Sequence, residues 1–313
     1  MANNFRFADA ETIASTGAFL QGELERLDPK LYEPIAEFTA LRDIKLREDV
    51  TIADSVSSFI LSSYAANSAP GSKKAWAKAL SSAIGRTSVD AQKVLNPMTP
   101  WAMEVAWNVI ELAQAQQVGR PIDSQKLSAM RMKHDSDLDQ QVYFGDAELG
   151  VKGLLNSDLV TAENVGALAD PTDASKVIST FNKILEKAWE QSQYTIIPHD
   201  ILIAPDLFAT LAATQLPNTE RNLLQYVREN NIAVANGTAV DIRPCKYLAS
   251  AFGGTGKRIV AYTNNQDYVR FPLVPLQHTA PQYRGLDQAS VYYCAMGVVE
   301  FVRPQLAFYA DLQ

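Results

Sequence analysis

The chain has 313 residues, of which 47% are apolar and 20% are charged, a composition typical of a globular protein with a sizeable core in one large domain or two ordinary ones. The formal net charge of −7 argues against a nucleic-acid-binding surface as the main function, because phosphate contacts need dense Lys and Arg. No apolar run reaches about 18 residues and the start lacks a basic segment followed by an apolar one, so neither a membrane span nor a signal peptide is expected.

Residues 1–50 are predicted to form an arm rather than a compact domain. Isoleucine and leucine recur at roughly helical spacing between Asp9 and Leu27, which predicts a short helix that Asp28-Pro29 ends. The next segment, KLYEPIAEFTALRDIKL, is broken by Pro34 and is too mixed in composition to form a core of its own. The region leans acidic, as in GELERLD.

The segment between Asp54 and Asp90 has the opposite character, because it contains basic residues and no acidic residue. Its basic residues include Lys73, Lys74, Lys78 and Arg86. We expect strand-like pieces around Val56–Tyr64, followed by a long, mobile excursion centred on Ala69–Gly85. Loops of this length are usually functional or disordered.

The stretch from Trp101 to Val109 alternates between large apolar residues and small or polar ones, which predicts a half-buried strand. The sequence ELAQAQQVG then predicts a short helical piece that stops at Gly119.

A long helix is predicted between about Asp123 and Gly145. Either Asp123 or Ser124 can cap its start, and Gly145 supplies the stop after its last turn. Its apolar positions fall on one narrow stripe, formed by Leu127, Met130, His134, Leu138 and Val142. A rod of about 33 Å with so narrow a stripe is expected to lie across a thin sheet rather than inside a thick core.

After Asn156 the sequence changes to an α/β pattern. DASKVISTFNKILEKAWEQSQY and ERNLLQYVRENN predict helices, and PDLFATLAA predicts another with Pro205 in its first turn. DILIAP, AVDIRPCKYL, KRIVAYTNN and DYVRFPLVP predict strands. The last 25 or so residues are strand-rich and dense in aromatic side chains, which are expected to pack rather than to stack on bases.

The stretch FGGTGKR, Phe252–Arg258, resembles a phosphate-binding loop only faintly. The Walker pattern needs a hydroxyl residue after the lysine and then a helix, whereas Arg258 stands there and a strand is predicted to follow. A glycine-rich turn is the favoured interpretation.

The stretch HDSDLDQ carries Asp135, Asp137 and Asp139 at alternate positions, as calcium loops do. Gln140 stands where such a loop needs glycine, and alternate residues of a helix point in different directions. We therefore expect a solvated acidic helix face, with His134 packed in the core.

Neither the 3 histidines nor the 2 cysteines fall in a signature spacing. Cys245 and Cys294 are isolated in sequence, which makes a reducing compartment the default, although the two could meet in space. The sequence therefore predicts no catalytic, cofactor-binding or metal site, and hence no enzyme. Extended arms of complementary charge are instead expected in an obligate assembly.

One long stretch, GRPIDSQKLSAMRMKHDSDLDQQVYFGDAELGVKGLLN, resembles the long helix and helix exit of the major capsid proteins of tailed bacteriophages. ELERLDPKLYE is similar to the N-terminal arm of that family, and HDILIAPDLFATLA to a strand and helix of its central domain. CAMGVVEFVRPQLAFYADL resembles the C-terminal strand. The family has Gly-Gly-Val and then Arg-Tyr-Pro there, whereas Glu300 and Phe301 intrude here and Gln305 follows Pro304. The resemblance spans most of the chain in order and identifies it as a diverged member.

The resemblance implies an α+β capsid fold with an N-terminal arm, an extended loop, a peripheral domain with a long spine helix, and an axial domain. In this sequence the arm would be residues 1–53, the extended loop with its flanking strands 54–96, and the peripheral domain 97–153 with spine helix 123–145. The axial domain would be 154–275, and 276–313 would be C-terminal strands that return to the peripheral domain.

The glycines Gly145, Gly150 and Gly153 would form the joint between the spine helix and the axial domain, because glycine permits positive φ and close backbone approach. Leu154 and Leu155 would fill the domain core, and Asn156 would turn the chain. The alternative is an ordinary helix end followed by a loop.

The function implied is a structural shell protein without cofactors, which assembles into pentamers and hexamers of an icosahedral head around double-stranded DNA. Its partners would be a scaffolding protein and a portal, with a decoration protein as a further candidate, and assembly would take place in the bacterial cytoplasm without a membrane. Lys73, Lys74, Lys78 and Arg86 would lie over a neighbouring subunit, although facing DNA in the lumen is the competing interpretation. An encapsulin-like compartment and an α/β hydrolase are the alternative functions.

Overall fold

A computed structural model of the chain describes residues 34, 36–66, 86–118, 122–166, 173–216, 221–249 and 258–312. Internal contacts divide the chain into two units, Met1–Glu37 and Phe38–Gln313, and the fold described below is that of the second unit. The expected helix at Asp9–Leu27, most of the basic excursion and the FGGTGKR turn up to Lys257 lie outside the described residues.

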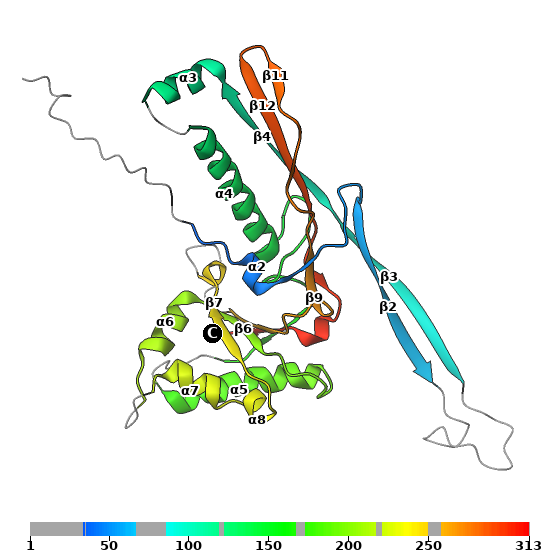
Figure 1. Cartoon of the computed structure of the whole chain (residues 1–313). Helices are drawn as coiled ribbons and strands as arrows, with labels where there is room; N and C mark the ends of the chain where they lie inside the picture. The colour runs from blue at the N-terminus through cyan, green and yellow to red at the C-terminus, as the bar shows by residue number, and fades with distance from the viewer. Residues whose placement is uncertain are drawn as a thin grey trace, which may run out of the picture. The chain divides into compact units, whose positions relative to one another are not determined.

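A long two-stranded hairpin is formed by β2 (Val56–Ala66) and β3 (Thr87–Pro97), as Figure 1 shows. The two strands are antiparallel and paired along their whole lengths, so that Val56 lies opposite Pro97 and Ala66 opposite Thr87. The strand expected at Val56–Tyr64 is therefore confirmed and is slightly longer. The second strand carries TSVDAQKV, whose mixed composition gives little strand signal of its own.

A four-stranded sheet follows, with β4 (Thr99–Asn108) paired along the whole of β12 (Asp287–Met296). The short strands β10 (Gln277–His278) and β11 (Gln282–Arg284) also pair with β12. The alternation predicted from Trp101 holds as far as Asn108, but Val109 is exposed and begins helix α3 (Val109–Val118). The chain has left the strand at that point, so the predicted strand is one residue too long.

The long helix, α4 (Ile122–Tyr143), packs against β4. The predicted stripe is confirmed, because Met130, His134, Leu138 and Val142 are all buried and Leu127 is partly buried. The predicted cap is wrong, since the helix begins at Ile122, ahead of both candidate cap residues. The sequence pattern missed that Asp139 and Tyr143 are also fully buried, on the flank of the stripe.

Leu138 provides a direct test of how this helix packs. Its side chain lies in a core cluster with Val142, Leu154 and Phe271. Truncation to alanine removes buried methyl groups and leaves a cavity, so we expect Leu138→Ala to lower the free energy of unfolding by about 2–5 kcal/mol. Denaturant unfolding measures this, and Leu127→Ala, at the partly buried first position of the stripe, should cost clearly less. Equal losses for the two variants would contradict the burial gradient along the helix.

A five-stranded sheet has the order β5-β14-β8-β6-β7. Its strands are β5 (Thr161–Asn164), β14 (Phe308–Asp311), β8 (Arg258–Tyr262), β6 (Asp200–Ile203) and β7 (Asp241–Pro244). The helices beside it are α5 (Ala174–Gln191), α6 (Pro205–Ala213), α7 (Leu223–Glu229) and α8 (Ile232–Ala235). The predicted elements of this region are confirmed, including the buried strand DILI and the proline at the first position of α6.

A three-stranded sheet joins β1 (Lys45–Arg47), β9 (Val269–Pro272) and β13 (Glu300–Phe301). Just before β1 lies the one-turn helix α2 (Ala40–Asp43), and short 3₁₀ turns occur at Lys246–Leu248 and Pro304–Leu306. Ala40 and Ile44 belong to the main core cluster. The last part of the expected arm of residues 1–53 therefore contains a helical turn and a sheet strand, and its residues Ala40, Asp43 and Ile44 are buried.

The C-terminal strands do not stay together. β12 pairs with β4 as expected, whereas β14 lies inside the five-stranded sheet, between β5 and β8. Strand β14 therefore differs from the expectation that the strands of residues 276–313 return to the peripheral domain of residues 97–153. The β14 side chains Phe308 and Ala310 are fully buried in the core beneath α5. The many aromatic residues of the segment do not indicate in which sheet the strand lies.

Both cysteines are buried and neither forms a disulfide. Burial raises the pKa of the Cys245 thiol to about 12 and that of the Cys294 thiol to about 11. Both thiols are consequently protonated and unreactive near neutral pH. None of the helices in the described ranges combines the length and apolar character that crossing a membrane requires.

Candidate functional site: the exit of the long helix and the exposed hairpin

The exit of α4 is a nine-residue turn bounded by two of the predicted glycines, Gly145 and Gly153. Gly145 has φ +74°, a left-handed conformation that glycine adopts without strain. A side chain there would also meet backbone atoms of Lys152 at 2.8 Å. Gly150 has φ +66° as well, but open space surrounds the position where a side chain would begin.

Gly153 differs from the other two glycines, because it is close approach and not φ that requires glycine there. A Cβ atom at this position would lie 2.5 Å from the carbonyl carbon of Tyr143 and 2.6 Å from the amide nitrogen of Phe144. The returning chain thus lies directly against the last turn of α4. No L-residue with a side chain fits this distance unless the backbone moves.

The close approach lets the chain after the turn satisfy the carbonyl groups that a helix end leaves unpaired. Leu154 N donates to Val142 O at 2.8 Å, and Leu155 N donates to Tyr143 O at 3.0 Å. Asn156 completes the set, because its Nδ2 donates to Phe144 O at 2.9 Å while its Oδ1 accepts from Gly153 N at 2.7 Å. Leu154 and Leu155 are both buried.

The same turn is attached to the five-stranded sheet. The buried Tyr309 hydroxyl, on β14, donates to Leu154 O at 2.5 Å, and Arg258 on β8 donates to Leu155 O at 2.8 Å. Arg258 also forms a two-pronged ion pair with Asp311. Residues 153–156 therefore connect the end of α4 to two adjacent strands of the five-stranded sheet.

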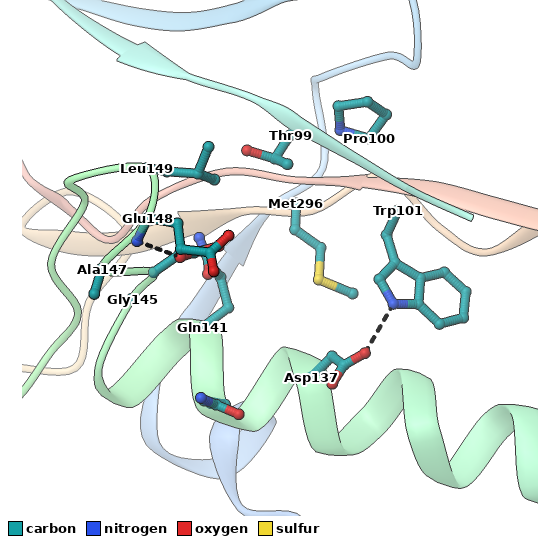
Figure 2. Close-up of a pocket in the computed structure, with 12 residues that line it drawn as sticks. Thr99, Pro100, Trp101, Asp137, Gln141, Gly145, Ala147, Glu148, Leu149 and Met296 are labelled. Atoms are coloured by element: carbon teal, nitrogen blue, oxygen red, sulfur yellow. Dashed lines mark hydrogen bonds between the residues drawn. The ribbon is translucent and has the colours of Figure 1, made fainter. Parts of the chain in front are cut away.

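A pocket of about 500 Å³ lies beside the helix exit, between α4, the start of β4 and the loop after Gly145 (Figure 2). Trp101 and Met296 form its apolar wall, and Trp101 Nε1 donates to Asp137 at 3.0 Å. Glu148 lies on the loop at its rim. The lining carries neither a histidine nor a cysteine, and the described residues contain no cluster of His, Cys, Asp and Glu that could hold a metal ion.

A buried polar cluster lies next to the exit, around Asp43 of α2. The Asp43 carboxylate accepts a hydrogen bond from the Tyr143 hydroxyl at 2.5 Å and pairs with Arg243 at 3.3 Å. Arg243 also pairs with the buried Asp200. Burial raises the pKa of the Tyr143 hydroxyl far above its usual value, so this hydroxyl stays protonated as a donor.

The expectation of a solvated acidic face on α4 is wrong for Asp139, which is fully buried. Its carboxylate accepts from Ala40 N at 2.8 Å and Thr39 N at 3.0 Å, and it pairs with Lys246 at 3.0 Å. It thereby supplies the missing cap of α2, which has no side-chain cap of its own.

The other two carboxylates of this helix face also have partners within the chain. Asp137 bonds to Trp101 and pairs with Lys133, and Asp135 contacts His134 Nδ1 at 2.9 Å. A count of charges along the sequence does not reveal these partners, because Lys133 and His134 are near neighbours on the helix and Trp101 is distant in sequence.

One face of the hairpin is apolar and exposed. In the antiparallel register, residues that lie opposite each other or two apart share a face. Val56, Ile60 and Tyr64 of β2 therefore share a face with Val89 and Leu95 of β3. These five residues, which we call the hairpin stripe, are 45% to 81% exposed.

The outer part of the hairpin is exposed on both faces, from Ile60 to Ala66 and from Thr87 to Lys93. A two-stranded hairpin alone is only marginally stable in water, and a soluble protein seldom exposes a row of large apolar side chains without a partner. Arg86, directly before β3, is exposed, whereas Lys73, Lys74 and Lys78 lie outside the described residues. The sequence predicted the strand but not which of its faces is unburied.

Comparison with known proteins agrees with this architecture. A family model described as "Major capsid protein" matches residues 73–312. The capsid of the Myoviridae phage XM1 has a similar structure, with a TM-score of 0.78 at 16% identity, covering 95% of this chain and 99% of that one. No curated protein matches the chain significantly.

Two further solved structures show how widely the fold is shared. Mycobacterium phage Adephagia matches with a TM-score of 0.60 at 10% identity, covering 98% of this chain and 99% of that one. A virus-like particle from Pyrococcus furiosus matches with a TM-score of 0.52 at 11% identity, covering 87% of this chain and 91% of that one. The family match covers well over half of the sequence and the fold is that of phage capsids, so this chain belongs to the major capsid protein family and is a structural protein of a virion shell.

Proposed function

We propose that the chain builds the icosahedral head of a tailed bacteriophage as pentamers and hexamers, around double-stranded DNA, and has no catalytic activity of its own. The observation that supports this most is the hairpin stripe, an apolar surface that the rest of the described chain leaves exposed. In a closed shell of identical subunits, a neighbouring copy can cover that surface on every subunit.

The segments then have distinct roles in the shell. The hairpin belongs to the extended loop expected at residues 54–96, and α4 is the spine of a peripheral part built on β4 and β12. The five-stranded sheet with α5 to α8 forms the axial part, to which β14 contributes. Gly145, Gly150, Gly153 and Asn156 form the joint between the spine helix and that sheet.

The partners proposed for assembly are a scaffolding protein and a portal, with a decoration protein as a further candidate, and assembly would take place in the bacterial cytoplasm. Electron microscopy of the purified protein, expressed with its scaffold, tests the proposal. Closed particles of megadalton mass are expected, and a small oligomer under all conditions would overturn it. An encapsulin-like compartment would give closed particles as well, but they would enclose protein cargo instead of DNA.

The basic excursion is proposed to lie over a neighbouring subunit and to meet an acidic surface there. Lys73, Lys74 and Lys78 have no acidic residue near them in sequence. The Asp135–Asp139 face of α4 is largely used within its own subunit, so the acceptors proposed are the exposed Glu148 and the acidic residues in the sequence of the N-terminal arm. A single exposed pair contributes only about 0–1 kcal/mol, but a shell repeats each contact on every subunit.

Reversing these three lysines to glutamate should leave a folded subunit that fails to close shells. High salt should weaken assembly of the unmodified protein in the same direction, because it screens exposed charges. Particle counts in electron micrographs, for protein made with scaffold but without genome, provide the measurement.

The matched control reverses Lys133, Lys152 and Lys176, which changes the net charge equally on exposed lysines of the body. The control should still form shells. If the excursion variant forms closed empty shells, the interface proposal is refuted, as expected if its lysines instead face the lumen and DNA.

A further inference from the structure

The root of the hairpin is the part next to the body, around Ser57–Phe59 of β2 and Asn96 of β3. Both strands of the root contact one buried carboxylate, that of Glu300 on β13. The Glu300 side chain is fully buried. Its Oε1 accepts from the Ser57 hydroxyl on β2 and from Asn96 Nδ2 on β3 at 3.2 Å. Ser57 and Asn96 are opposite each other in the hairpin register, so a single oxygen atom binds both strands at the same level.

The other oxygen of the same carboxylate binds the body of the protein. Glu300 Oε2 accepts from Arg270 Nε at 2.7 Å and lies 3.5 Å from an Arg47 guanidinium nitrogen. Arg47 is on β1. Arg270 is on β9 and lies directly opposite Glu300 in the pairing of β9 with β13. All three strands of the three-stranded sheet thus contribute a charged residue to the hairpin root.

Arg47 and Arg270 also reach the hairpin directly. Arg47 donates to the Ser57 hydroxyl at 2.9 Å and to Ser58 O at 3.1 Å, and Arg270 lies over the Phe59 ring at 5.8 Å. Arg47 is also paired with Asp49, so two arginines face two carboxylates and the cluster is balanced in charge. Phe59 is on the hairpin face opposite the hairpin stripe. The body therefore contacts the hairpin on the face that does not carry the stripe.

We propose that Glu300 is the positioning residue of the hairpin, which fixes the direction in which the hairpin stripe is presented to another copy of the chain. The hairpin beyond Phe59 is largely exposed, so its root is where the body can set its direction. A small tilt at a root shared by both strands moves the far end of 11-residue strands by much more. This inference rests on the proposed role of the hairpin stripe as an inter-subunit contact.

Glu300→Gln keeps the shape and one acceptor oxygen but removes the charge that holds Arg270. We expect backbone amides of β2 and β3 to exchange hydrogen for deuterium about tenfold faster, the change that corresponds to loss of one charge-assisted hydrogen bond. Amides of β6 and β8 in the five-stranded sheet should keep their protection. The same subunits should form fewer closed shells.

The double variant Glu300→Gln with Arg270→Gln removes both charges together. It should recover part of the hairpin protection and part of the shell yield, because the arginine is no longer left without its carboxylate. Asp311→Asn is the control, since it breaks an arginine–carboxylate ion pair on β14, away from the hairpin, and should leave hairpin exchange unchanged. Should Glu300→Gln fail to fold, Asn96→Ala removes one hairpin contact of the carboxylate and leaves its contacts with both arginines in place; hairpin exchange should again become faster.

The outcomes separate the two proposals. Unchanged hairpin exchange in Glu300→Gln, or faster exchange throughout the protein, overturns the positioning role, because the residue is then dispensable or merely part of general stability. Faster hairpin exchange with normal shells supports the positioning role but refutes the hairpin stripe as the decisive inter-subunit contact. Faster hairpin exchange together with lost shells supports both.

Discussion

Replacing Gly153 with valine should lower the free energy of unfolding by about 3–5 kcal/mol and give aggregated subunits instead of shells. The reason is the 2.5 Å separation between the position of a Cβ atom and the carbonyl carbon of Tyr143. Backbone lies on both sides of this contact, so no flexible side chain can move aside. Relief requires the chain to lift off the helix end, which breaks the hydrogen bonds that Leu154 and Leu155 donate to α4.

Gly150→Ala is the matched control for that substitution. Gly150 lies in the same turn with φ +66°, but its Cβ position is in open space. The expected loss is therefore only the left-handed strain of about 1–2 kcal/mol. Thermal or denaturant unfolding of the two variants provides the comparison. Normal particle yield and an unchanged melting temperature for Gly153→Val would contradict the close-approach explanation.

This substitution bears on function as well as stability, because the turn connects α4 to two strands of the five-stranded sheet. Tyr309 and Arg258 hold the carbonyl groups of residues 154 and 155 from the sheet side, while the amides of the same residues bond to the helix. The joint is thus bonded on both sides within two residues. In an assembling shell, that arrangement fixes the helix exit relative to strands β14 and β8 of the sheet.

Elements whose determinants lie close in sequence could be predicted from the sequence. Helix α5 has a strong amphipathic pattern, a cap at Asp173 and core residues at helical spacing. The turn at Gly145 follows from a glycine placed just after the last periodic residue of α4. In both cases neighbours within a few positions decide the conformation.

Features that depend on distant partners could not be predicted. Asp139 looks like part of a solvated acidic run, because its binding partners Thr39 and Ala40 are about 100 residues away. Glu300 appeared in the sequence only as a departure from the family pattern, and its hairpin partner Ser57 is 243 residues away. The place of β14 in the five-stranded sheet likewise depends on pairing with β8, which no local pattern encodes.

Asp139→Ala should lower the free energy of unfolding by about 3–5 kcal/mol, the usual cost of removing one partner from a buried ion pair. The side chain of Asp139 has 1% of its surface exposed and bonds to two backbone amides as well as to Lys246. Its loss leaves the amides of Thr39 and Ala40 without acceptors and Lys246 without its carboxylate. Both consequences carry a desolvation cost in addition to the lost bonds.

Asp135→Ala is the control on the same helix, one turn earlier. The Asp135 side chain is 47% exposed and contacts only His134 among the described charged groups, so its removal should cost no more than about 1 kcal/mol. Denaturant unfolding of both variants measures the difference, and hydrogen exchange locates it. Amides of α2 and β1 should lose protection in Asp139→Ala before those of the five-stranded sheet, because the carboxylate caps the start of α2. Equal stability of the two variants would mean that the α2 cap is not held by Asp139, and that residues 39–44 are fixed by other contacts, such as those of Asp43 with Tyr143, Arg243 and the Tyr262 hydroxyl.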